Sequence, residues 1–187
     1  MEAFNFLSVL LSIILGLAIT QVLQGFRGIL LGRAKVRLYW PVLVWGIVLL
    51  AMFVQSWWAM FGLRRVDAWT FAMFSVVLLQ TIISYMLAAL VFPDFTGTAT
   101  IDLRQHYFEH RQWYFGFTIA ILLASLGKDL VLDGHLPDAL NVEFHVCFIA
   151  AAVLAMLVRS EWYHKALPLV TAAALAAYIA ILFSRLR

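Results

Sequence analysis

The sequence predicts an all-α integral membrane protein: a bundle of about six transmembrane helices in a single domain, residues 1–187. Composition is the first reason, because 65% of the residues are hydrophobic and 12% are charged, against about 45–50% and about 25% in soluble domains. A soluble fold could not bury that much apolar surface, so lipid is expected to cover it. The second reason is six apolar runs near the length of about 20 residues that a helix needs to cross a bilayer. Tryptophans near the ends of these runs are the third, since indole rings prefer the membrane interface.

The first three spans are expected at residues 4–23, 40–63 and 69–91. No Lys or Arg precedes the first apolar run, so we expect an uncleaved span there rather than a signal peptide. Pro41 lies in the first turn of the second span, where its missing N–H costs little. Pro93 ends the third span.

The polar segment 100–112 is expected to form a short interfacial helix between spans three and four. Thr100 is its expected cap. Its larger apolar side chains would dip toward lipid: Ile101, Tyr107 and Phe108. Three further spans are expected at residues 113–132, 139–158 and 166–183. No linker interrupts this pattern, which is why one domain is expected.

Lysine and arginine predict the orientation, because cytoplasmic connectors are enriched in them. The connectors after spans one, three and five hold eight of these residues, against five in the other two connectors and the C-terminal tail. Four of the eight follow the first span: Arg27, Arg33, Lys35 and Arg37. We therefore expect a multi-pass protein of a cell membrane, of the bacterial inner-membrane type, with both termini outside.

A ladder of small and polar side chains occupies every fourth position of the first span: Ser8, Ser12, Gly16, Thr20 and Gln24. Such a row permits a close right-handed helix crossing, so tight packing is one interpretation. A wet path is the other, because side-chain amides need polar partners away from lipid. The residues expected to line that path are Ser12, Thr20, Gln21, Gln24, Gln55, Gln80 and Ser84. Gln80 lies near the middle of its span and is the best single candidate.

Four ionisable residues lie toward the outer ends of the fourth and fifth spans: Lys128, Asp129, Glu143 and His145. Charges cost much less near the interface than at mid-bilayer, so a salt bridge between hydrated helix ends would explain them. Alternatively they form a gate or a cation site at the outer mouth. His145 is the expected proton-responsive group within the membrane, or else a core histidine with satisfied hydrogen bonds.

Asp102, His106 and His110 follow one another at four-residue spacing and share one helical face. Two histidines at i and i+4 can bind one metal ion, and His164 could add a ligand. The glutamate and glycine signatures of metalloenzymes are missing here, so solvated polar residues on an interfacial helix are the simpler interpretation. No nucleotide-binding or hydrolase motif occurs in the sequence, and we do not expect an enzyme.

The function expected from these patterns is a small channel or carrier for an ion or small neutral solute, working as a homo-oligomer in the bilayer. The alternative is a non-transporting sensor or partner subunit that signals to a cytoplasmic protein through the 100–112 segment. A metal- or haem-dependent membrane enzyme is the third, least favoured class; no cofactor is expected. The scattered formal charge of +3 gives no sign of nucleic-acid binding.

Overall fold

The computed structural model of the chain describes residues 2–32, 35–66, 68–95 and 100–182. Its helices are α1 (Glu2–Leu31), α2 (Trp40–Ala59), the 3-10 helix η2 (Met60–Arg65), α3 (Phe71–Val91), α4 (Leu103–Asp133), α5 (Ala139–Leu157) and α6 (Glu161–Leu182). Two short strands complete the fold: β1 (Val36–Arg37) and β2 (Ile101–Asp102). Arg33 of the first connector and Phe183, the expected end of the sixth span, lie outside the described residues.

Within the described residues, six helices are long and apolar enough to cross a membrane. The prediction of an all-α bundle with six helices of membrane-spanning length and composition is confirmed. Local signals set several helix ends, and of these the position of Pro41 was expected. Pro41 lies in the first turn of α2, and the hydroxyl of Thr70 accepts a hydrogen bond from the Met73 N–H to begin α3. Gly134 ends α4 with a φ of 73°, in the left-handed region that glycine adopts most readily.

The separate interfacial helix expected at residues 100–112 is not present as such, because these residues form the connector end and first turns of one continuous α4. Asp102, rather than Thr100, caps the helix by accepting from the N–H groups of Arg104 and Gln105. Tyr107 is also not turned toward lipid, since it is only 6% exposed and packs in the core. Polar residues interrupt the hydropathy of this segment, but they are good helix formers and let α4 begin early.

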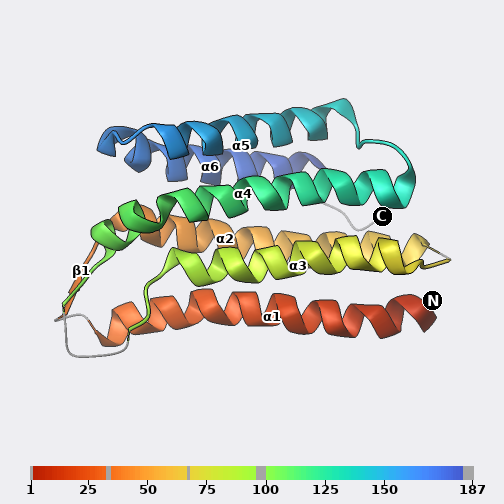
Figure 1. Cartoon of the computed structure of the whole chain (residues 1–187), viewed down its shortest axis with the longest axis horizontal. Coiled ribbons are helices and arrows are strands. Elements are labelled where there is room, and N and C mark those ends of the chain that lie inside the picture. The colour runs from red at the N-terminus through yellow and green to blue at the C-terminus, as the bar shows by residue number, and fades with distance from the viewer. Residues whose placement is uncertain (1, 33–34, 67, 96–99, 183–187) are drawn as a thin grey trace.

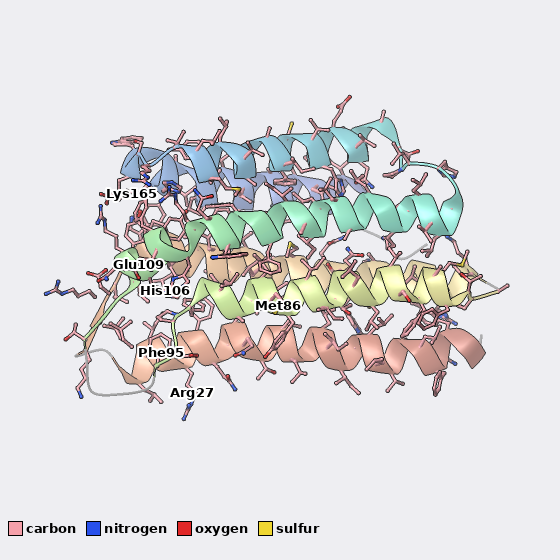
Figure 2. All side chains as sticks on the ribbon, in the orientation of Figure 1. Arg27, Met86, Phe95, His106, Glu109 and Lys165 are labelled. Carbon is pink, nitrogen blue, oxygen red and sulfur yellow. The ribbon has the colours of Figure 1, made fainter. Side chains whose placement is uncertain are left out.

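The six long helices close into a ring whose principal neighbours run α1, α3, α4, α5, α6, α2 and back to α1. Figure 1 shows that successive helices alternate in direction, so α1 begins and α6 ends at the same end of the bundle. We call this the terminal end; it also holds η2 and the connector between α4 and α5. The opposite end, with β1 and β2, is the bridge end. Figure 2 shows Glu109 and Lys165 near the bridge end.

A two-residue parallel pairing of β1 with β2 joins the two longer connectors at the bridge end. Val36 pairs with Ile101 and Arg37 with Asp102, and the Arg37 guanidinium lies 3.9 Å from the Asp102 carboxylate. The connector after α1 is thereby fixed to the connector before α4.

Phe92, directly after α3, packs against two glycines on neighbouring helices. A Cβ added to Gly25 of α1 would lie 2.8 Å from Cβ of Phe92, and one added to Gly46 of α2 would lie 2.8 Å from its Cζ. The ring of Phe92 also meets that of Phe26 edge-on at 5.0 Å. Only residues without a side chain leave room for this aromatic ring between α1 and α2.

The face of α1 that packs into the bundle is made of Leu11, Leu15, Ala18, Val22 and Ile29. The polar ladder lies on other faces of the helix. We use the name α1 row for its four exposed members: Ser12, Gly16, Thr20 and Gln24. A Cβ added to Gly16 would meet nothing within 4 Å, and the Thr20 hydroxyl donates to the Gly16 carbonyl of its own helix at 2.8 Å. The tight helix crossing expected along this row is therefore not formed within the chain.

Candidate functional site

Two adjoining hollows run into the bundle from the terminal end. The outer one, which we call the vestibule, has a volume of about 450 Å³ and is lined by apolar residues together with polar and charged residues of η2 and of α2 to α6. The inner one, the cavity, has a volume of about 120 Å³ and lies among α2 to α6. Five residues line both hollows and form the junction between them: Gln55, Ser56, Gln80, Ser125 and Tyr178.

Ion pairs occupy the vestibule. Arg65 donates to both carboxylate oxygens of Asp133 at 2.9 Å, which joins η2 to the end of α4. Lys128 Nζ lies 3.0 Å from Asp129 Oδ1. Of the expected outer-mouth residues, these last two line the vestibule and pair with each other. Glu143 is exposed and does not line it.

One face of α4 lines the whole length of the two hollows. Ser125 follows Thr118 by seven residues, and Lys128 and Asp129 follow Ser125 by three and four, so these four residues share one side of the helix and form what we call the α4 row. Thr118 lines the cavity, Ser125 lines the junction, and Lys128 and Asp129 line the vestibule. The polarity of the wall therefore rises from the interior toward the terminal end.

The structure brings together three of the seven residues expected on the polar path. Gln55 and Gln80 line the junction, and Ser84 lines the vestibule while its hydroxyl donates to the Gln80 carbonyl at 2.9 Å. Gln21 lies elsewhere, in the α1–α3 interface, where its amide donates to the Tyr85 hydroxyl at 3.2 Å. The remaining three belong to the exposed α1 row and do not line either hollow: Ser12, Thr20 and Gln24.

An aromatic cluster lies at the end of the cavity that faces the bridge end. Trp45 meets Tyr114 and Phe115 edge-on, with ring centroids 5.5 and 5.7 Å apart. Beyond them the buried Tyr107 hydroxyl lies 2.8 Å from Nδ1 of His164, whose Nε2 lies 2.9 Å from the Val158 carbonyl oxygen. A carbonyl only accepts, so in the neutral ring Nε2 donates to it and Nδ1 accepts from Tyr107.

The bridge end carries a further buried aromatic side chain outside the spans. Tyr39 precedes α2 and is 5% exposed. Burial raises the pKa of its hydroxyl to about 12, and the nearby carboxylate of Glu161 adds to the rise. This hydroxyl therefore stays uncharged at physiological pH.

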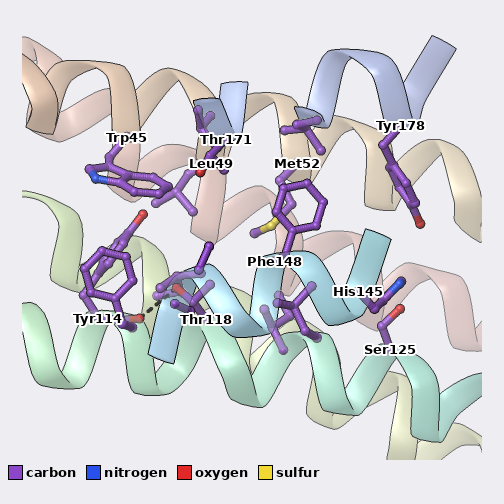
Figure 3. Close-up of a pocket in the computed structure, with 18 of the residues that line it drawn as sticks. Trp45, Leu49, Met52, Tyr114, Thr118, Ser125, His145, Phe148, Thr171 and Tyr178 are labelled. Carbon is purple, nitrogen blue, oxygen red and sulfur yellow. Dashed lines mark hydrogen bonds between the residues drawn. The ribbon is translucent and has the colours of Figure 1, made fainter. Parts of the chain in front are cut away.

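His145 lies at the other end of the cavity, beside the junction. Figure 3 shows it with Ser125 and Tyr178, whereas Trp45 and Tyr114 lie at the opposite end. Its ring is 4% exposed, and Nδ1 lies 2.9 Å from the Asn141 carbonyl oxygen. The Asn141 side chain in turn accepts a hydrogen bond from the Tyr178 hydroxyl at 3.2 Å. His145, Asn141 and Tyr178 therefore form one polar cluster inside an apolar wall.

The four candidate metal ligands have other partners. Asp102 caps α4, His106 Nε2 lies 3.1 Å from the Leu90 carbonyl, and His110 Nδ1 lies 3.0 Å from the His106 carbonyl. His164 is held between Tyr107 and Val158. In the part of the chain that the structure describes, no group of three or more His, Cys, Asp or Glu side chains could hold a metal ion.

Sequence reasoning did not select Ser56, Ser125, Thr118 or Tyr178 as site residues, although all of them line the hollows. A signal was present on α4, because Ser125 follows Thr118 by two helical turns and leads directly to Lys128 and Asp129. No comparable spacing points to Tyr178.

No family model matches the chain, and neither a curated protein nor a solved structure is detectably similar to it. The chemistry of the site therefore rests on its own geometry. The described residues that line the cavity include no Asp, Glu, Lys or Arg. An ion in the cavity would meet no side chain of opposite charge, and an unpaired ion in such a low-dielectric environment has a high free energy. An uncharged molecule with an apolar part and one or more polar groups fits the lining best.

Proposed function

We propose that this protein is a membrane carrier for a small uncharged solute, which enters through the vestibule and is held in the cavity. The observation that carries the proposal is the junction, where a polar hollow from the terminal end meets an apolar one through the same five side chains. A carrier is favoured over an open channel because the packed rings of Trp45, Tyr114 and Phe115 lie between the cavity and the bridge end.

The charge of the lining favours a neutral solute over an ion. Four charged side chains of the vestibule form two pairs, Arg65 with Asp133 and Lys128 with Asp129, and Asp138 adds a carboxylate at its rim. Deeper in the bundle, the polar groups at the junction are amides and hydroxyls. A neutral solute can exchange its hydrogen bonds with water for bonds to these groups as it enters.

The distribution of Lys and Arg further supports a location in a cell membrane of the bacterial inner-membrane type, with the terminal end outside. The vestibule would then open to the outer side. The alternative of a sensor that signals through the 100–112 segment has less support, because Leu103, Tyr107 and Arg111 of this segment are buried in the bundle.

The test is solute flux into liposomes that contain the purified chain. Swelling after an osmotic step, with glycerol or 1,2-propanediol as the permeating solute, should be faster than in protein-free liposomes. Gln80→Leu should reduce the rate to the protein-free value while the protein remains folded, because Gln80 lines both hollows.

Gln24→Leu is the matched control, since the same change on the exposed α1 row lies away from both hollows. Its flux should equal that of the unaltered chain. Flux through Gln80→Leu that matches the unaltered chain would exclude a role for this amide. Wild-type flux no faster than protein-free liposomes for both solutes would overturn the proposed activity.

A further inference from the structure

Two residues with ring nitrogens line the cavity, Trp45 and His145, and the indole N–H of Trp45 only donates. Nδ1 of His145 lies 2.9 Å from the carbonyl oxygen of Asn141. A carbonyl oxygen only accepts, so Nδ1 carries the proton. In the neutral ring Nε2 is then a hydrogen-bond acceptor. His145 lines the cavity, and it therefore offers an acceptor to whatever occupies that space.

The groups around His145 leave this acceptor role in place. On α6 the Tyr178 hydroxyl gives its one proton to Asn141 Oδ1. On α4 Lys128 is paired with Asp129 at 3.0 Å, and both line the vestibule rather than the cavity. The wall contributed by α2 and α3 near the junction is formed by the uncharged Gln55, Ser56 and Gln80.

The size and lining of the cavity define the rest of the ligand. An apolar cavity of about 150 Å³ accommodates a benzene molecule, and this one measures about 120 Å³. Leu49, Met52 and Phe148 provide apolar contacts between its two ends. A body of about one ring, or a short branched chain, fills such a space.

We propose that the cavity binds a small alcohol or phenol, with its apolar body against α2, α4 and α5 and its hydroxyl donating to Nε2 of His145. The inference deepens the proposed carrier function by naming the class of solute, and it rests on that function for its role in transport. The binding step itself is independent of flux and can be measured alone.

The experiment compares two probes of nearly equal shape, 4-fluorophenol and 1,4-difluorobenzene, of which only the first can donate a hydrogen bond. Fluorine NMR titrations would use the full chain in lipid nanodiscs, with empty nanodiscs as the partition background. Both probes should bind to the chain above this background. His145→Phe, which keeps a ring and removes Nε2, should weaken 4-fluorophenol about five- to tenfold. It should change 1,4-difluorobenzene less than about twofold, because that probe makes no such bond.

Matched variants separate the site from general effects. His110→Phe makes the same change at a histidine that lines neither hollow, and it should leave both affinities unchanged. Thr171→Leu fills the cavity wall and should weaken both probes. Should His145→Phe fail to fold, His145→Asn keeps a donor for the Asn141 carbonyl while removing Nε2, and the same selective loss is expected.

Equal affinity of 4-fluorophenol for the unaltered chain and for the His145 variant would overturn the proposal. So would binding of both probes no stronger than to empty nanodiscs. The two levels of inference fail differently: selective binding without solute flux would sustain the ligand class and remove the carrier function. Flux that depends on Gln80 but not on His145, with no probe binding, would sustain the carrier function and remove the proposed ligand class.

Discussion

The α1 row and the α4 row both place hydrophilic side chains on one side of a long helix, yet the bundle places them on opposite sides of its wall. The α1 row has small or polar residues at every fourth position, and the α4 row has two hydroxyl and two charged residues. The α4 row lines the cavity, the junction and the vestibule, whereas the four members of the α1 row are exposed. A helix presents such a row to the interior only if its neighbours are arranged around that face.

The difference has a physical cause in the membrane. In water the apolar face of a helix must turn inward, whereas lipid is as apolar as leucine and imposes no such preference. α1 packs through Leu11, Leu15, Ala18 and Val22, and its main contacting helices are α2 and α3. Packing shape, rather than polarity, therefore decides which face of α1 is inside.

The largest expected effect comes from replacing glycine by alanine on the packed face of α1 and comparing it with the same substitution on the exposed face. Gly25→Ala would place a Cβ 2.8 Å from Cβ of Phe92, near the root of that side chain, and should destabilise the fold by about 1–3 kcal/mol. Gly16→Ala meets nothing within 4 Å and should stabilise slightly, by up to about 1 kcal/mol, through helix propensity. Thermal unfolding in detergent measures both. Equal unfolding temperatures for the two variants would show that the two faces of α1 do not differ in packing.

A second effect, confined to transport rather than to folding, is expected when one side chain of each row is enlarged. Ser125→Leu should fill the junction and slow glycerol flux about ten- to a hundredfold, if the added volume costs about 1–3 kcal/mol at the narrowest point. Thr20→Leu adds similar bulk on the exposed face of α1 and should leave the flux unchanged. The liposome swelling assay compares them directly. A loss of flux in Thr20→Leu alone would reverse the assignment of the two rows.

The smallest effect concerns two neighbouring glutamines of α1. The Gln21 amide donates to Tyr85 of α3, while Gln24 is exposed. Interhelical hydrogen bonds in membranes average about 0.6 kcal/mol. A double-mutant cycle of Gln21→Leu with Tyr85→Phe should therefore give a coupling near this value, and one of Gln24→Leu with Tyr85→Phe should give none. A larger coupling for the Gln24 cycle would contradict the arrangement of α1 against α3.

The number and type of the long helices could be predicted from the sequence, because runs of apolar residues near the bilayer thickness leave few alternatives. The start of α4 could not, since Asp102 caps the helix before the polar residues that reduce its hydropathy. Among the expected path residues, Gln55, Gln80 and Ser84 do line the hollows. Periodicity places Ser12, Thr20 and Gln24 on one face of α1, but it carries no information about what that face meets. Tyr178 enters the site from a different helix, and only the ring order of the helices brings it there.

The pairing of β1 with β2 bears on how such a bundle could move. The pairing connects the segments that lead into α2 and α4, and it restrains the bundle at the bridge end. The close packing of Phe92 against Gly25 and Gly46 restrains the same region. A change in helix tilt would then pivot about the β1–β2 pairing. Displacements grow with distance from a pivot. The opening of the vestibule, where Arg65 pairs with Asp133, is therefore the part of the bundle that can widen or narrow most.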